Sequence, residues 1–449
     1  MKDVAALLGI LILLPLLILG VKTAGSRFGL SGELKRKMVH VGMGLTCLSF
    51  PWLFSSWPWV AGLCAGSLTL LSGVRWQERR TGAASALHDI QRHSWGEICF
   101  PIAVVAVFAL AEGEAWRYVI PILVLTLADA AGALVGVRYG KQSFHVLSGL
   151  KTLEGSLLVF LVAFLSVHVP LLLMTETGRA ETLLISLVLA ILAMLGEAVS
   201  IHGLDNLFLP VLVALLLPAY AAMDQTALLV RVAVATGLLV LVLSLRKFSS
   251  LEGGALLAAV LLGYAAFCFG DWRFLLPPLI LFGEHLWVNH RSRKAGWTPR
   301  LETNDLWAIL GLGIGFAPSL ALAASHPDGK GIALRSLAVA AAIHLACVDY
   351  TTWLFVTNRS GNEWIRQRSV GKALLFVLVP GFVLSGWDAS ALILVIGAAL
   401  IVEAGLWAFR GALGDPASYP NNPRRWLMQG GTCALGSVGL WAIEHWVKS

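Results

Sequence analysis

Long apolar runs separated by short polar stretches occupy almost the whole chain. At roughly 20 residues per membrane span, we count about sixteen such runs, the first from Val4 to Gly20. Nearly nothing remains for a soluble domain. The pattern predicts an all-α fold, a polytopic transmembrane helical bundle. We expect the first run to be a retained span and not a signal peptide, because no clear small-residue cleavage site follows it.

The apolar pattern continues to the end of the chain, but the density of polar motifs falls near Arg246. We therefore predict two multi-span membrane domains, residues 1–248 and residues 249–449. The second domain holds about seven of the predicted spans. No strong internal repeat relates the two halves.

Composition supports the membrane class. The 449 residues are 57% hydrophobic and only 13% charged. Soluble globular proteins have a lower hydrophobic content and a higher charged content. The mean hydropathy is +0.79. The six cysteines are scattered, mostly within apolar runs, and no pair has metal-ligand spacing, so we interpret them as core residues.

The net charge of +7 is distributed unevenly between alternate loops. If the spans alternate in direction, every basic cluster falls on one side of the membrane, while the opposite loops are short and hold few cations. The asymmetry predicts that the basic side is cytoplasmic and that both termini lie on the opposite side. Topology and anionic lipid headgroups explain this charge better than nucleic acid does, so no nucleic-acid partner is expected.

The stretch from residue 129 to residue 156 carries the densest candidate chemistry. Asp129 lies inside membrane-grade sequence, where a carboxylate is costly and indicates a functional site. Gly132, Gly136 and Gly140 follow at four-residue intervals, a spacing that lets a second backbone approach one helix face. The polar loop after them carries a lysine, and a Lys-Thr-x-Glu-Gly element precedes the next apolar run. An acid, cations and glycines at a membrane surface suit a metal-bound phosphate.

Three further polar groups stand at the ends of apolar runs on the same predicted face. Arg36, Lys37 and His40 share one helix face near the second run. Glu97 opens a later run, and Glu197 and Asp205 flank the turn before another. If these acids were unrelated surface charges, they would not need to stand at the ends of so many apolar runs.

Phosphoryl transfer needs positioning and charge neutralisation more than covalent chemistry, and Mg²⁺ takes one or two carboxylates plus phosphate oxygens. We find neither a Walker-type loop nor a protein-kinase signature set. The predicted catalytic residues are Asp129, Lys151, Glu154, His40 and Glu97. The predicted nucleotide- and phosphate-binding residues are Arg36, Lys37, Gly136, Gly140, Lys141, Thr152 and Gly155. The predicted metal ligands are Asp129, Asp205 and Glu197.

Four ordered elements resemble the CTP-dependent lipid-alcohol kinase family, which includes phytol kinase and dolichol kinase and is distantly similar to CDP-diacylglycerol synthases. They are residues 33–40 (ELKRKMVH), 92–101 (RHSWGEICFP), 129–141 with 151–156 (DAAGALVGVRYGK and KTLEGS), and 197–210 (EAVSIHGLDNLFLP). The resemblance covers about residues 25–225, and its second element looks most like phytol kinases.

The resemblance implies transfer of the γ-phosphate of CTP to an isoprenoid or other lipid alcohol, phytol-like by preference, with Mg²⁺ or another divalent cation. Mapped onto this sequence, the family pattern marks Asp129, Gly136, Gly140, Lys141, Lys151, Glu154, Gly155, Asp205 and Asn206.

The second half is faintly similar to a membrane family that contains plant phytyl-phosphate kinases. The similar pieces include residues 252–263 (EGGALLAAVLLG) and residues 347–353 (CVDYTTW), which contain Asp349. Leu354 and Phe355 stand where that family usually has an acidic element. The resemblance implies a fused second phosphorylation that would give the diphosphate.

Two other function classes stay open at this point. A cytidylyltransferase acting on a lipid phosphate would share the Asp and Lys-Thr-x-Glu-Gly elements. A membrane transporter or non-catalytic scaffold would also have many spans and glycines. His40, Glu97 and Glu154 are all candidates for the catalytic base, and the sequence specifies neither the alcohol nor the oligomeric state.

Overall fold

The structure is a computed structural model that describes residues 2–81, 95–146, 149–200, 203–294, 306–326, 329–357, 363–386, 391–413 and 423–448. Residues 92–94 and 201–202, which belong to two of the sequence elements above, lie outside the described residues. The chain forms two compact units, Met1–Thr236 (unit 1) and Gly237–Ser449 (unit 2). The predicted division after residue 248, which rests on motif density, stays a prediction.

Helices dominate both units. Sixteen helical segments of at least 15 residues follow one another in the described residues when uninterrupted helices are joined. Nine of the described helices are long and apolar enough to cross a membrane, and three further apolar helices are shorter. The all-α membrane class is therefore confirmed, while a total of about sixteen spans stays a prediction.

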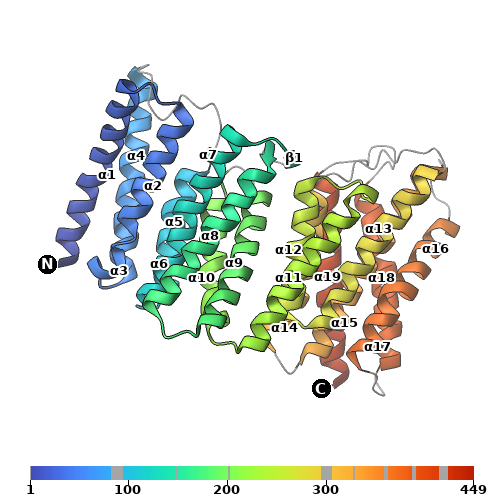
Figure 1. Cartoon of the computed structure of the whole chain (residues 1–449). Coiled ribbons are helices and arrows are strands. Elements are labelled where there is room, and N and C mark those ends of the chain that lie inside the picture. Colours follow the sequence, from blue (N-terminus) through green and yellow to red (C-terminus); the bar gives the residue numbers. More distant parts are fainter. Residues whose placement is uncertain are drawn as a thin grey trace. The chain divides into compact units, whose positions relative to one another are not determined.

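Unit 1 is a bundle in which successive long helices alternate in direction, as Figure 1 shows. A continuous helical run from α6 through a π-helical turn, η1, to α7 passes through it, and α11 crosses the boundary to unit 2. The helices are α1 (Lys2–Arg27), α2 (Gly32–Cys47), α3 (Phe50–Leu53), α4 (Trp57–Thr81), α5 (Gly96–Leu110), α6 (Ala115–Leu123), η1 (Val124–Ala128), α7 (Asp129–Tyr139), α8 (Leu153–Met174), α9 (Arg179–Val199), α10 (Asp205–Ala221) and α11 (Gln225–Leu245).

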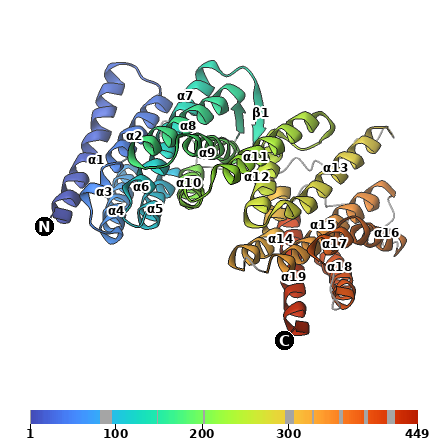
Figure 2. The same ribbon diagram turned by 60° about the horizontal axis from the view of Figure 1, so that its bottom comes forward.

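Because the helices alternate, the starts of α2, α5, α8 and α10 lie at the same end of unit 1 as the ends of α7 and α9 (Figures 1 and 2). Side-chain caps fix two of these starts. The Ser31 hydroxyl accepts from the Leu34 N–H at 3.3 Å, and the Thr152 hydroxyl accepts from the Gly155 N–H at 3.2 Å. Such caps satisfy backbone donors that have no partner within the helix.

The close backbone approach that the glycine spacing predicted is found between α7 and α8. A Cβ added at Gly155 would lie 2.9 Å from the Gly132 carbonyl oxygen and 3.2 Å from the Gly136 Cα. No side chain fits there without moving the backbone. Gly132, Gly136 and Gly155 thus hold the start of α8 against α7, directly after Asp129.

The polar loop between α7 and α8 contains a small antiparallel hairpin, β1 (Ser143–Val146) and β2 (Gly149–Thr152), in which Phe144 pairs with Lys151. The sequence analysis predicted a loop here and no strands. Gly149 has a φ of 126°, which L-residues rarely adopt, so the turn depends on glycine. The hairpin sets the direction of Lys151 just before α8 begins.

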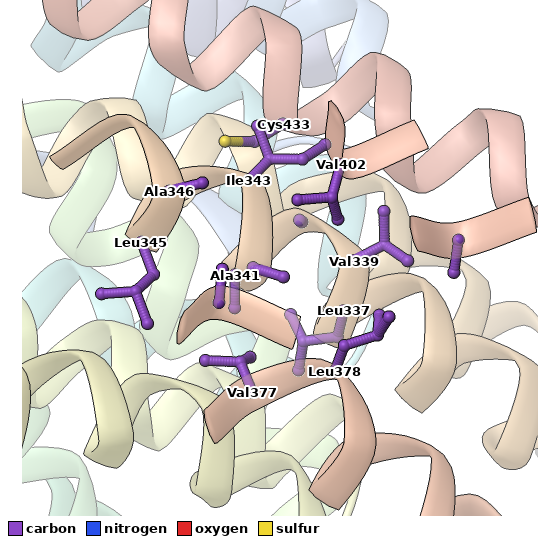
Figure 3. Packing of buried hydrophobic residues seen from close by; sticks show 14 of the residues in the cluster. Leu337, Val339, Ala341, Ile343, Leu345, Ala346, Val377, Leu378, Val402 and Cys433 are labelled. Carbon is purple, nitrogen blue, oxygen red and sulfur yellow. The ribbon is translucent and has the colours of Figure 1, made fainter. Parts of the chain in front are cut away.

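Unit 2 is built around α15, which packs against α13, α14, α16, α17, α18 and α19. Leu337, Val339 and Ile343 of α15 meet Val402 of α18 and Cys433 of α19 in the buried core that Figure 3 shows. The helices are α12 (Gly253–Phe269), α13 (Leu276–Lys294), α14 (Leu306–Ser325), α15 (Lys330–Thr357), α16 (Glu363–Ala373), the π-helical turn η5 (Leu374–Leu378), α17 (Val379–Ser385), α18 (Ala391–Leu413) and α19 (Pro423–Lys448), with short 3₁₀ turns η2 (Arg246–Phe248) and η3 (Trp272–Leu275).

Candidate active site

Polar side chains from five elements of unit 1 meet at the end of the bundle where α2 and α10 begin. The first residue of α7, the last turn of α9, the first residue of α10 and strand β2 each supply one, and α2 supplies two. They are Lys37, His40, Asp129, Lys151, Glu197 and Asp205.

Three carboxylates form the centre of this cluster. One oxygen from each of Asp129, Glu197 and Asp205 lies within 4.8 Å of the others. In the part of the chain that the structure describes, no other group of three acidic, histidine or cysteine side chains is close enough to hold a metal ion. The structure therefore brings together the three residues that the sequence analysis selected as metal ligands, although Asp129 and Asp205 come from different helices. We refer to them below as the acidic triad.

Lys37 neutralises one member of the triad. Its Nζ donates to Asp129 Oδ2 at 2.7 Å and lies 3.4 Å from the Asp129 carbonyl oxygen. The Lys37 side chain is 3% exposed and that of Asp129 is 9% exposed, so this is a buried ion pair. A buried charge without its partner is strongly destabilising, and each residue therefore fixes the position of the other.

His40 lies on the same side of Asp129, one turn beyond Lys37. Its Nε2 is 3.2 Å from the Leu125 carbonyl oxygen and 3.5 Å from Asp129 Oδ2. Both neighbours are acceptors, so Nε2 carries a hydrogen and the Nδ1 of the neutral ring is the nitrogen that can take a proton. Phe100 packs edge-on against the ring, with centroids 5.3 Å apart.

Lys151 neutralises a second member of the triad. Its Nζ donates to Glu197 Oε1 at 2.6 Å and also contacts the Glu197 carbonyl oxygen. This carbonyl belongs to the last turn of α9, where four carbonyls have no partner within a helix. The hairpin residue Lys151 thereby ties β2 to the end of α9.

Asp205 has no such partner. Its Oδ1 is buried and receives no hydrogen bond from the described residues. The cluster thus holds three carboxylates, two lysines and one histidine, and a buried oxygen remains unsatisfied. Carboxylates this close repel one another, and either a proton or a bound cation must offset that repulsion. A hard, oxygen-preferring divalent cation fits this donor set.

The predicted phosphate-binding backbone surrounds the start of α8. Thr152 caps this helix, Gly155 lies in its first turn, and a Cβ added at Gly136 would lie 3.0 Å from the Thr152 hydroxyl. The start of a helix carries unpaired N–H groups and a partial positive charge, which favour an anion. Gly140 ends α7 with extended backbone and is exposed.

The structure also places the four remaining charged residues of unit 1 that the sequence analysis selected. The exposed Lys141 follows Gly140, and the Glu154 carboxylate accepts from the Gln142 N–H at 3.3 Å. Arg36 is exposed and pairs with Glu33 at 2.6 Å. Glu97 stands in the first turn of α5, beside Gly96, whose carbonyl accepts from Asn206 Nδ2 at 3.2 Å.

Sequence reasoning missed the π-helical turn η1, which directly precedes Asp129. Such turns are frequent at functional sites. Its carbonyl of Leu125 holds His40, and its buried Thr126 side chain fills the space where Gly44 lacks a side chain. A threonine within an apolar run was the only signal in the sequence.

Asp349 in unit 2 lies in a different environment. Its Oδ2 accepts from Arg368 at 2.5 Å and from the Ser369 hydroxyl at 2.8 Å, and its Oδ1 accepts from Lys372 at 3.2 Å. Lys372 also pairs with Glu284 at 2.5 Å. Two carboxylates and two cations are thus matched.

Comparison with known proteins finds a phytol kinase whose sequence is similar to that of this chain. The sequence is 31% identical over 192 residues to the phytol kinase of Synechocystis sp. (strain ATCC 27184 / PCC 6803 / Kazusa), a match that covers 41% of this chain and 78% of that protein. The chain belongs to the phytol kinase family. The phytol kinase match leaves more than half of the chain unmatched. No family model matches the sequence, and no solved structure is similar to it.

Proposed function

We propose that unit 1 is a CTP-dependent lipid-alcohol kinase that acts on phytol or a similar isoprenoid alcohol. The observation that carries the proposal is the acidic triad with its unpartnered Asp205 oxygen, flanked by Lys37 and Lys151, in a member of the phytol kinase family. Phosphoryl transfer requires such a combination of carboxylates for a cation and lysines for phosphate oxygens.

Asp129, Asp205 and Glu197 would hold Mg²⁺ or another divalent cation. When bound, the cation would neutralise negative charge on the nucleotide phosphates and polarise them. Asp205 has the free oxygen for this role, while Asp129 and Glu197 are already oriented by lysines. The lysines can each exchange part of a carboxylate contact for a phosphate oxygen.

The start of α8 and Lys151 are suited to the phosphates of the nucleotide. The start of α8 carries the partial positive charge of a helix N-terminus, and Gly155 and Gly136 keep side chains away from this position. Lys141 and Arg36 are exposed cations at the same end of the unit and are suited to screening charge on the entering nucleotide. The choice of CTP over ATP rests on the family resemblance.

In the proposed reaction the alcohol oxygen attacks the γ-phosphorus of CTP. A new P–O bond forms, the bond between the γ-phosphorus and the β–γ bridging oxygen breaks, and CDP leaves. The alcohol proton must go to a base, and we assign it to Nδ1 of His40. His40 Nε2 lies 3.5 Å from Asp129 Oδ2, whereas the Glu154 carboxylate is engaged by the Gln142 N–H.

The experiment uses membranes containing the full chain, Mg²⁺, γ-labelled CTP or ATP, and a panel of lipid alcohols. The proposal predicts label in an alcohol monophosphate from CTP, loss of that label in Asp129→Asn, and wild-type transfer in Glu114→Gln. Glu114 is an exposed acid that precedes α6 and makes no side-chain cap bond, so it is a matched control. Transfer by Asp129→Asn at the wild-type rate, or no transfer from either nucleotide to any alcohol, would contradict the proposal.

The same assay separates the other activities considered. A cytidylyltransferase releases pyrophosphate and incorporates an α-label but no γ-label. A transporter or scaffold consumes no nucleotide. A fused second kinase step in unit 2 would give a doubly labelled diphosphate, and that product would disappear selectively in Asp349→Asn.

We further propose that the acidic triad faces the cytoplasm and that both termini lie on the other side. The support is the basic charge at the loops of this end, which matches the cytoplasmic bias of Lys and Arg. A membrane-impermeant thiol reagent should label Lys141→Cys only from the cytoplasmic side in sealed vesicles. Labelling only from the opposite side would reverse the orientation.

A further inference from the structure

A cavity of about 150 Å³ lies inside unit 2. Its walls are mostly apolar side chains from α12, α13 and α15 and the end of α11, among them Leu238, Val260, Leu281, Phe282 and Leu345. A cavity of this size holds a molecule about as large as benzene. The walls therefore suit a segment of a hydrocarbon chain.

One residue of the cavity wall also has a donor that nothing in the described chain uses. The indole Nε1 of Trp426 is buried and unpartnered among the described residues, and Trp426 itself is 2% exposed. His344 stacks on Trp426 with ring centroids 6.3 Å apart, and both residues line the cavity. The Gln429 amide nitrogen lies 3.0 Å from His344 Nδ1, so a donated bond there leaves the imidazole hydrogen on Nε2. An unsatisfied buried donor is costly, and a ligand acceptor would remove this cost.

The charged groups of the cavity are already balanced. Glu284 and Asp349 line it as acceptors, and Lys372 lies between them, at 2.5 Å and 3.2 Å. Arg368 supplies the second positive charge at 2.5 Å from Asp349. Both Lys372 and Arg368 are thus already paired with carboxylates, so a phosphate entering beside Glu284 and Asp349 would add negative charge next to two acids, which is unfavourable in a buried place. A pure hydrocarbon would leave the Trp426 N–H unsatisfied.

We propose that this cavity of unit 2 binds a lipid alcohol: a single apolar chain with one uncharged hydroxyl. The hydroxyl accepts from the Trp426 N–H and donates to a carboxylate of the wall, and the chain occupies the apolar part. The ligand belongs to the substrate class of the proposed function, and the site is separate from the acidic triad, so unit 2 would hold alcohol whether or not unit 1 phosphorylates it.

The test is photocrosslinking of the purified full chain in detergent micelles. The probe is a hexadecanol analogue with a diazirine in its chain, and the comparison probe is its phosphate monoester. Labelled peptides are identified by mass spectrometry, with excess phytol as competitor. Ala259→Phe places a ring in the cavity, and Trp426→Phe removes only the indole N–H and part of the ring. Size-exclusion elution of each variant verifies folding.

The proposal predicts that the alcohol labels peptides of α12, α13 or α15, that phytol competes, and that labelling falls at least fivefold in Ala259→Phe and severalfold in Trp426→Phe. The phosphate probe should label these peptides much less. Asp205→Asn, which should keep the stability of the protein, should label like the wild type even if it has lost kinase activity, so this test and the kinase test fail separately. Equal or stronger labelling by the phosphate probe, or labelling unaffected in whichever of the two variants is folded, would overturn the proposal.

Discussion

The acids at the centres of the two units differ in whether all of their buried oxygens have hydrogen-bond partners. In unit 2, Asp349 accepts from Arg368, Lys372 and the Ser369 hydroxyl, and both of its oxygens are satisfied. In unit 1, the acidic triad contains Asp205, whose buried Oδ1 has no partner among the described residues. Asp349 and Asp205 both stand at or within apolar runs, where an ionised side chain is costly and indicates a function. Only the structure shows that their environments differ. A compensated acid holds helices together, whereas an uncompensated one is available to a ligand.

This difference bears on the faint resemblance of unit 2 to phytyl-phosphate kinases. A second kinase site would need carboxylate oxygens free for a cation and cations free for phosphate. Asp349 and Glu284 are occupied by Lys372 and Arg368 instead. We therefore expect the charged cluster of unit 2 to contribute mainly to stability, and the following substitutions test that contrast.

The largest effect is expected from Lys37→Met, because it leaves Asp129 buried without its cation. Unfolding free energy should fall by about 3–5 kcal/mol, and transfer activity should be lost. Thermal unfolding in detergent and the γ-label assay measure the two effects. Arg36→Met is the control for stability, because its exposed pair with Glu33 is worth at most about 1 kcal/mol. The double variant Lys37→Met with Asp129→Asn should recover stability but not activity; a stable, active single variant would contradict the buried-pair interpretation.

Asp205→Asn should separate activity from stability. Since Asp205 Oδ1 has no hydrogen-bond partner among the described residues, removal of this carboxylate relieves repulsion in the triad, and thermal stability should stay the same or rise. Transfer should nevertheless fall by roughly 10²–10³-fold, the loss typical when one preorganised electrostatic contact is removed from a site. Destabilisation comparable to that of Lys37→Met would show that Asp205 has a structural role.

Asp349→Asn should show the reverse. Removing this carboxylate weakens hydrogen bonds to two cations and should cost about 2–3 kcal/mol of unfolding free energy. The monophosphate-forming activity of unit 1 should stay at the wild-type level. If the variant loses a diphosphate product without losing stability, the contrast between the two units is wrong and unit 2 is catalytic.

Gly155→Ala should have a smaller effect, through position and not charge. The new methyl would lie 2.9 Å from the Gly132 carbonyl oxygen and 3.1 Å from the Thr152 hydroxyl, so α8 must shift. Overpacking of this kind costs about 1–3 kcal/mol. Gly237→Ala in α11 is the matched control, because nothing lies within 4 Å of its added Cβ. Equal stability of the two variants would show that the contact between α7 and α8 is looser than described.

The sequence predicted the membrane class and the members of the triad for a physical reason. Asp129, Glu197 and Asp205 stand at or within apolar runs, where an ionised group is costly enough to require a function. Alternation of the runs was enough to predict that all three share one membrane face. The glycine spacing after Asp129 likewise predicted the close approach of a second backbone, which α8 provides.

The partners of these acids were not predictable from the sequence. Lys37 and Asp129 are far apart along the chain, and their pairing depends on how α2 packs against η1. The π-helical turn itself is set by tertiary packing around Thr126, since no local motif marks it. Asp349 is buried, and its candidate role in a second site stays a prediction; its matching cations come from α16, and no pattern in the sequence links them.

The most direct measurement is the binding of Mn²⁺, as a paramagnetic substitute for Mg²⁺, to the purified full chain by electron paramagnetic resonance. The account predicts a bound ion in the wild type and in Asp349→Asn, and a large loss of binding in Asp205→Asn. Added CTP should change the spectrum of the bound ion. Equal Mn²⁺ binding by Asp205→Asn and the wild type would contradict the claim that the acidic triad is the cation site.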